Sequence, residues 1–357
     1  MWSASWQAAD RLLPVALLLT ICLAAAGCGG GPAARDSNAL PAPDDIEGWN
    51  RRIPAGVIAV WGMSDESPRQ AELDAKAQVA ATIQSTLESE TTSFMAATMR
   101  DADVQDVQEM TSRVTVRTTF SRAELIRVVP GTAHHKDGVY RVMAGVERQE
   151  LATALSADYE AASVRFRSNG ELLAGLTHEL PAYTAAWSRT RDAYADVLAR
   201  AVEVRTASRL DPAGLAADRD SWRRLEAERA ALLNGLTVVI QLKEHPELNH
   251  QELAERLRAG FARLGVGASG SRCVPGAALL ELEPILTWTR VIGRVCALEL
   301  SGELRPCDGD DIWTEVEVSD SALRGEGRDP VGQLQRNLTP EILASLLRES
   351  LSHVIPF

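Results

Sequence analysis

Hydrophobic positions between residues 57 and 146 switch from the period of a strand to the period of a helix and back again. Val57–Gly62 is a short apolar run of strand length. Small and apolar residues then recur at every fourth position over Ala71–Ile83, which is the spacing of a helix face. Ser67, followed by Pro and then Gln three positions on, marks the helix start, and the pattern runs to about Glu90.

Alternating residues predict the strands that this helix would cover. Apolar and polar positions alternate over Val114–Phe120 and again over Tyr140–Val146, and Ala123–Val129 is a third candidate. A further helical piece is expected around residues 101–110. The segment 48–150 is therefore predicted to be a small module in which a helix packs on an antiparallel sheet.

The segment 151–235 has helical periodicity. Mostly apolar residues seven apart form two interleaved rows, Leu176, Tyr183, Thr190, Val197 and Val204 in one and Leu180, Trp187, Tyr194, Ala201 and Ser208 in the other. Asp211-Pro212 ends this pattern, and a shorter stripe begins at Trp222. The two stripes predict an antiparallel helical hairpin packed within the chain, with an oligomerisation seam as the alternative.

The segment 236–357 predicts a second module of the same kind. Leu236–Leu242 is a candidate buried strand, and a capping box at Asn249 starts a helix. Three further strands are expected, and Thr339-Pro340 starts a last helix. The expected strands are Ala278–Arg290, Val295–Leu304 and Ile312–Val318.

The N-terminus has the features of an export signal. An apolar run of about fifteen residues ends near Ala26, which is signal-peptide length and short for a membrane-spanning helix. Leu23–Gly29 (LAAAGCG) resembles the lipobox of bacterial lipoproteins, in which small residues precede the cysteine that is acylated. The resemblance implies that residues 1–27 are removed and that Cys28 carries lipid. An ordinary signal peptide cut after an alanine is the alternative.

The residues after Cys28 are rich in Gly, Pro, Ala and Ser, so the segment 28–47 is predicted to be a flexible tether. Several acyl chains anchor a protein firmly, because each buried CH₂ contributes about 0.8 kcal/mol. Gly29 occupies the position where lipoproteins kept at the inner membrane often carry Asp. This favours the outer membrane, with the folded part facing the periplasm.

The first module also resembles a known family. A strand containing Gly62, then the Ala and Val stripe from Ser64 to Ile83, then strands ending in Asp137–Ala144 (DGVYRVMA), look like the envelope lipoprotein family typified by the Lpp-twenty antigen. The resemblance covers about 100 residues, namely the motifs from Ser64 to Ala144 and the residues that flank them. It implies a structural or assembly role. The family pattern contains no catalytic residues, so none is assigned here.

Composition and charge narrow the classes of partner. The 357 residues are 45% hydrophobic and 24% charged, which is globular composition, and the net charge is −12. That charge argues against nucleic acid and anionic headgroups as main partners. Of the five cysteines, Cys22 is expected to leave with the signal and Cys28 to carry the lipid. In an oxidising compartment one disulfide can form among the remaining three, and the expected hairpin places Cys273 and Cys307 together at its open end. Three unpaired cysteines are the alternative.

The other motifs do not predict catalysis, a metal or a cofactor. His134-His135 and the pair His245 and His250 lack metal-ligand spacing, and are expected to be solvated. The segment 265–270 is Gly-rich but follows a helix, whereas phosphate loops precede one, so a flexible linker is expected. Residues 308–311 (DGDD) lack the closing Glu of a calcium loop, so a solvated turn is expected.

The sequence therefore predicts an α+β protein with two modules joined by a helical hairpin. The favoured function is that of a non-enzymatic, outer-membrane-anchored lipoprotein that contacts other envelope proteins. A binding protein for a small or lipophilic ligand is the first alternative, and a hydrolase with an unrecognised site is the second. The oligomeric state is left open.

Overall fold

The stripe of small residues predicted on a helix lies on α2 (Pro68–Thr98), where Ala71, Ala75, Val79 and Ile83 are all buried. The computed structural model describes residues 40–98, 104–177, 179–269, 272–289, 294–309 and 311–357. Within these, Pro43–Phe357 forms one compact unit. The helix α2 extends to Thr98, beyond its expected end near Glu90.

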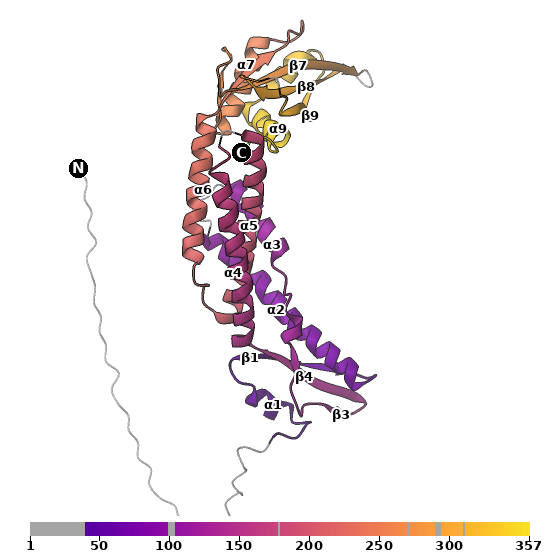
Figure 1. Cartoon of the computed structure of the whole chain (residues 1–357). Coiled ribbons are helices and arrows are strands. Elements are labelled where there is room, and N and C mark those ends of the chain that lie inside the picture. Colours follow the sequence, from indigo (N-terminus) through magenta and orange to yellow (C-terminus); the bar gives the residue numbers. More distant parts are fainter. Residues whose placement is uncertain (1–39, 99–103, 178, 270–271, 290–293, 310) are drawn as a thin grey trace, which may run out of the picture. The chain divides into compact units, whose positions relative to one another are not determined.

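The first sheet has four strands and is antiparallel (Figure 1). β4 (Val139–Glu147) is central and pairs with β1 (Val57–Ser64) on one side. On its other side it pairs with β2 (Arg127–Val128) and β3 (His134–Lys136). One helical turn, η1 (Ala123–Leu125), precedes β2, so the strand expected over Ala123–Val129 is only partly formed.

The helix α2 packs on this sheet at Gly62. A Cβ atom at this position would lie 2.1 Å from the backbone nitrogen of Ala75 and 2.2 Å from the carbonyl oxygen of Ala71. Only a glycine therefore allows β1 and α2 to approach this closely. The small residues of α2 serve the same purpose from the helix side.

The strand expected over Val114–Phe120 is wrong, because these residues belong mostly to α3 (Val104–Arg117). Val114 is fully buried whereas Val116, two positions on, is 79% exposed, so the two side chains do not share a face as they would in a strand. Met110 and Thr118, four residues to either side of Val114, are also buried. The burial therefore follows a period of four, and the valine and threonine propensity for strands is overridden by packing.

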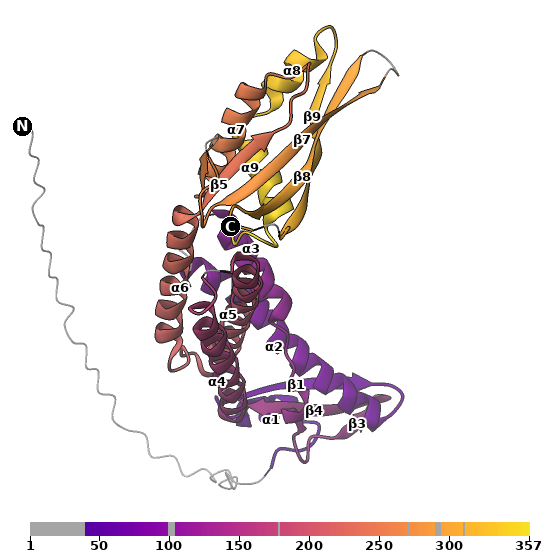
Figure 2. The same cartoon turned by 45° about the horizontal axis from the view of Figure 1, so that its top comes forward.

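The helical segment contains three long helices, so the predicted hairpin omits one of them (Figure 2). They are α4 (Arg148–Leu173), α5 (Leu180–Ser208) and α6 (Leu215–Gly235). The helix α4 begins directly after β4 and packs along α5. Pro181 lies in the first turn of α5, where a proline is tolerated, so the chain breaks between α4 and α5 rather than continuing.

An aromatic cluster joins these three helices. Trp222 of α6 stacks on Tyr194 and Trp187 of α5, with ring centroids 4.6 and 5.1 Å apart. Phe166 of α4 lies 5.1 Å from Tyr194. Such contacts add to the apolar area that each ring buries. Several residues of the predicted heptad rows thus pack within the chain, as the sequence indicates.

The second sheet has five strands in the order β6-β5-β7-β8-β9. Its strands are β5 (Thr237–Leu242), β6 (Gly267–Ser269), β7 (Ala278–Thr289), β8 (Val295–Pro306) and β9 (Thr314–Glu326). β5 pairs in parallel with both β6 and β7, so this sheet is mixed rather than antiparallel as predicted. The reason is α7 (His250–Arg263), which carries the chain from the end of β5 back to the start of β6.

Three helices cover one face of the second sheet, namely α7, α8 (Pro330–Asn337) and α9 (Pro340–Leu351). The sequence predicts α7 and α9 but not α8. It also predicts a linker over 265–270, of which Gly267–Ser269 is the edge strand β6. The last strand, β9, is longer than the strand expected over Ile312–Val318, since it runs from Thr314 to Glu326.

The α+β class predicted from the sequence is confirmed. One buried cluster contains α2, β4 and the three long helices, and it includes Val79, Ala144, Leu155, Leu198 and Trp222. A second cluster lies between the five-stranded sheet and its helices. The first sheet and the helical segment thus share one core.

The close contact at Gly62 gives a direct test of the packing of α2 on β1. We expect Gly62→Ala to lower the free energy of unfolding by about 2 kcal/mol, because the new methyl group overlaps backbone atoms of α2 that cannot move aside. Gly56→Ala is the matched control, since no atom lies within 4 Å of the added Cβ there. Urea unfolding measures both, and equal effects of the two substitutions would contradict the packing described.

Candidate functional site

The first sheet has an apolar cavity on the face opposite α2. Ala59 and Gly145 are direct cross-strand partners on β1 and β4, and together they form a floor with almost no side chain. A Cβ at Gly145 would lie 2.9 Å from the carbonyl oxygen of Ile58, so glycine is required there. The cavity has a volume of about 400 Å³, within the range of about 300–1,000 Å³ typical of small-molecule sites.

The walls of the cavity come from two stretches of chain that flank the floor. One is α1 (Ile46–Arg52) with the residues after it, and the other is the chain around β2. The apolar lining residues, which include Met143 and Val146 of β4, are Trp49, Ile53, Pro54, Val57, Leu125, Val128, Val129, Pro130, Met143 and Val146. The charged lining residues are Arg52, Arg127, Glu147 and Glu150.

Hydrogen bonds within the chain hold both walls in place. The Trp61 indole donates to the Asn50 side chain of α1 at 3.1 Å. On the other side, Thr132 accepts from the backbone N–H of Met143 at 3.1 Å and donates to the carbonyl oxygen of Val129 at 2.7 Å. The cavity is therefore built into the fold of the sheet and its connections.

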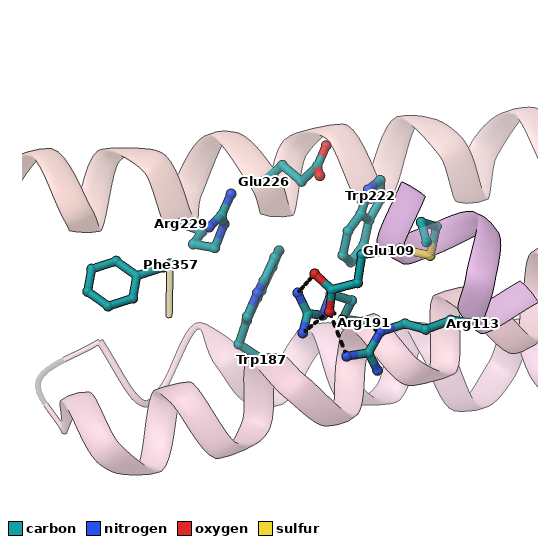
Figure 3. Close-up of a pocket in the computed structure, with 9 residues that line it drawn as sticks. Glu109, Arg113, Trp187, Arg191, Trp222, Glu226, Arg229 and Phe357 are labelled. Atoms are coloured by element: carbon teal, nitrogen blue, oxygen red, sulfur yellow. Dashed lines mark hydrogen bonds and ion pairs between the residues drawn. The ribbon is translucent and has the colours of Figure 1, made fainter. Parts of the chain in front are cut away.

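A second pocket lies among the helices and is rich in arginine (Figure 3). Glu109 of α3 forms ion pairs with Arg113 at 2.8 Å and with Arg191 of α5 at 3.0 Å. Arg229 of α6 lies over the ring of Trp187 and donates to the carbonyl oxygen of Pro356. Burial lowers the pKa of Arg191, although Glu109 opposes the shift. The pocket holds only about 20 Å³, which is room for about one water molecule.

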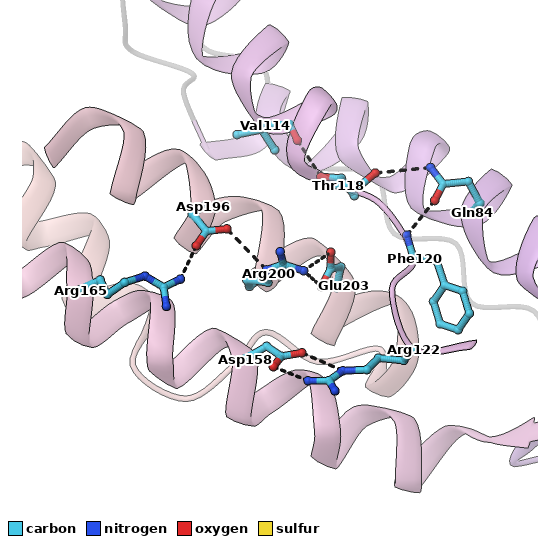
Figure 4. Close-up of polar contacts among 10 residues, drawn as sticks. All are labelled: Gln84, Val114, Thr118, Phe120, Arg122, Asp158, Arg165, Asp196, Arg200 and Glu203. Atoms are coloured by element: carbon cyan, nitrogen blue, oxygen red, sulfur yellow. Dashed lines mark hydrogen bonds and ion pairs between the residues drawn. The ribbon is translucent and has the colours of Figure 1, made fainter. Parts of the chain in front are cut away.

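A chain of charges runs between α4 and α5 and ends at a buried carboxylate (Figure 4). Arg165 pairs with Asp196 at 2.6 Å, and Arg200 donates to both oxygens of Glu203 at 2.9 Å. Glu203 is 2% exposed. Burial raises the pKa of Glu203 to about 7, against the opposing effect of Arg200. Glu203 also lines a small cavity of about 50 Å³.

A second buried carboxylate, Asp218 of α6, has a fuller set of partners. The hydroxyls of Tyr159 and Ser163 donate to one carboxylate oxygen at 2.7 and 2.8 Å. Arg167 donates to the other oxygen from its Nε at 2.9 Å. Burial raises the pKa of Tyr159, and the hydrogen bond to Asp218 adds to this shift. These contacts tie α6 to α4.

The sequence predicts a disulfide between Cys273 and Cys307 and a lipidation site at Cys28. Cys273 and Cys307 form a disulfide, with their Cα atoms 5.4 Å apart, at the open end of the β7–β8 hairpin. The predicted hairpin of the last two long strands indicates the same pair of cysteines. Cys296 is free and buried on β8. The predicted lipidation site, Cys28, lies outside the described residues.

The other sequence motifs do not form a chemical site. His134 and His135 lie on β3 rather than in a turn, and His134 lies edge-on to Trp61. The ring of His250 contacts the carbonyl oxygen of Lys243 at 3.0 Å. In the described part of the chain, no group of three or more acidic, histidine or cysteine residues is placed to hold a metal ion.

Sequence reasoning missed the cavity under α1. Its floor depends on which residues of β1 and β4 stand opposite each other, and its walls come from segments far apart in the sequence. The available signal was the pairing of small residues, Ala59 and Gly145, on two adjacent strands, together with Trp49 in a short helix before them.

Comparisons with known proteins give little information on function. No family model matches the sequence, and no curated protein matches it. Among solved structures, the secreted protein HP1454 from Helicobacter pylori matches with a TM-score of 0.35 and 12% identity, over 84% of this chain and 99% of that chain. The resemblance of the first module to the Lpp-twenty family therefore stays a prediction.

The disulfide should contribute measurably to stability. The cysteines are 34 positions apart, and closing a loop of this length lowers the entropy of the unfolded chain, which stabilises the folded protein by about 4 kcal/mol. We expect a reductant to lower the free energy of unfolding of the unaltered protein by about that amount. The double variant Cys273→Ser, Cys307→Ser serves as the control and should not respond to reductant. A response of equal size in both proteins would contradict the assignment.

The raised pKa of Glu203 predicts a pH dependence of stability. Its pKa lies above the ordinary value of 4.5 in the folded state, so the folded protein binds more protons between pH 4.5 and about 7. The free energy of unfolding should therefore fall as pH rises through this window, by on the order of 3 kcal/mol, and then level off. Glu203→Gln should remove most of the slope in urea unfolding measured at several pH values. Asp220→Asn, at an exposed position on α6, is the control.

Proposed function

We propose that this protein is a lipoprotein of the bacterial outer membrane, anchored through Cys28 and facing the periplasm, with a structural or assembly role in the cell envelope. The observation that carries the proposal is the sequence Leu23–Gly29, in which small residues precede a cysteine at the end of an apolar run. The Gly- and Pro-rich segment that follows supports a tethered arrangement.

One feature of the described chain supports an address outside the cytoplasm. The disulfide between Cys273 and Cys307 is typical of proteins that fold in an oxidising compartment. In the described residues, no helix combines the length and apolar character needed to cross a bilayer. An acyl anchor at Cys28 would supply membrane attachment by itself.

The role as a binding or assembly protein, rather than an enzyme, rests on how the charged groups are used. Around the arginine-rich pocket, Glu109 is engaged by Arg113 and Arg191, and the space among them admits about one water. Glu203 and Asp218 are buried and occupied by helix-to-helix or within-helix contacts. These charges support the packing of the helices, which favours a scaffold.

A second candidate function, the binding of a lipophilic ligand, is favoured by the cavity on the first sheet. Its size and its mainly apolar lining are those of a small-molecule site. This function is compatible with the first, because an anchored envelope protein works next to lipids.

The anchor can be tested by changing the two N-terminal cysteines separately. We expect Cys28→Ser to abolish incorporation of labelled palmitate and to move the protein from the membrane fraction to the soluble fraction, since Cys28 supplies the thiol that is acylated. Cys22→Ser is the matched control, because it changes a cysteine of the same apolar run that does not follow the small residues. Labelling that persists in the Cys28→Ser protein would contradict the proposal.

A further inference from the structure

The cavity on the first sheet is apolar inside and charged at its edge. Aliphatic side chains and Trp49 form its walls, while the floor at Ala59 and Gly145 offers no side-chain hydrogen-bonding group. Apolar surface left open to water is unfavourable, and an apolar occupant would remove that cost. A ligand with an apolar portion and a polar end matches this distribution.

The charges at the edge are balanced in sign. Arg127 pairs with Glu150 at 2.5 Å, and both side chains remain partly accessible, at 71% and 35%. Arg52 and Glu147 provide one further charge of each sign among the lining residues. A phosphate is bound well by a guanidinium, and an ammonium by a carboxylate. The edge therefore complements a headgroup that carries both charges better than one that is purely anionic.

The place of the cavity in the chain favours a membrane amphiphile. Its wall α1 begins at Ile46, so the last two residues of the segment predicted to be the tether are the first two of this helix. If Cys28 is acylated, the seventeen or so residues up to α1 extend over at most about 60 Å. The first sheet would then stay within reach of the bilayer that holds the anchor. This step rests on the proposed function.

We infer that the cavity binds one acyl chain of a zwitterionic phospholipid, with the chain over Ala59 and Gly145 and the headgroup among the charges at the edge. The walls are already held by the Trp61–Asn50 and Thr132–Met143 hydrogen bonds, so binding requires little rearrangement. A prearranged site of this kind loses less free energy to ordering on binding.

The probe is myristoyl lysophosphatidylethanolamine, a zwitterionic phospholipid with a single acyl chain. The protein is the full mature chain with Cys28→Ser, which removes its own acylation and the need for detergent. We expect saturable one-to-one binding by native mass spectrometry and calorimetry. Absence of saturable binding would overturn the inference.

Substitutions then place the lipid in the cavity. Ala59→Phe fills the floor and should weaken binding by about tenfold or more, equivalent to about 1.4 kcal/mol. Met63→Phe is the matched control, since Met63 lies on the same strand and face but is 54% exposed and outside the cavity. Ile53→Asp is a second variant, which places a charge in a partly exposed wall without filling the floor. Thermal unfolding shows which variants fold, and equal affinities of the folded variants and Met63→Phe would overturn the assignment.

The headgroup is tested with myristoyl lysophosphatidylglycerol, which has the same chain and a purely anionic head. We expect weaker binding than for the ethanolamine lipid, and equal binding would overturn the role given to the charged edge. The measurement does not depend on the anchor. If the ethanolamine lipid does not bind but palmitate labelling depends on Cys28, the cavity assignment is rejected and the anchor stands. If the lipid binds but labelling does not depend on Cys28, the anchor is rejected and the cavity assignment stands.

Discussion

The burial of α5 between other helices is the constraint on which most of the first core depends. This helix packs against α2, α3 and α4, and its buried residues include Tyr194, Leu198 and Val202. A helix buried on several sides must satisfy its polar groups without water. Thr184 does so by donating toward the carbonyl oxygens of Leu180 and Val354, which also ties the helix to the C-terminal segment.

The buried carboxylates Asp218 and Glu203 satisfy their hydrogen-bonding groups without water in two different ways. Asp218 accepts from Tyr159, Ser163 and Arg167, so each of its oxygens has a partner from α4. Glu203 has Arg200, one turn away on the same helix, as its ion-pair partner. A single cation does not offset the cost of burying the charge, and the pKa of Glu203 rises. The first carboxylate therefore joins two helices, whereas the second is sensitive to pH.

The cavity arises from the same packing on the other side of the first sheet. Gly62 brings β1 against α2 on one face, while Ala59 and Gly145 leave space on the opposite face. The short helix α1 does not fill this space, because it meets the sheet at its edge through Trp61 and Asn50. A rigid sheet backed by α2 thus carries an open apolar site next to the segment predicted to be the tether.

The sequence by itself determined the elements with strong local signals. The stripe from Ala71 to Ile83, the capping residues Asn249 and Thr339 and the alternation in β7 fixed helices and strands, because burial on one face imposes its period on the residues. The sequence also predicted an export signal, and it indicated which two cysteines form the disulfide. Only the tertiary structure decided that Val114 lies in a helix and that β5 runs parallel to β7, since either choice satisfies the local pattern. The cavity was decided there too, because its floor and walls exist only once distant segments pack together.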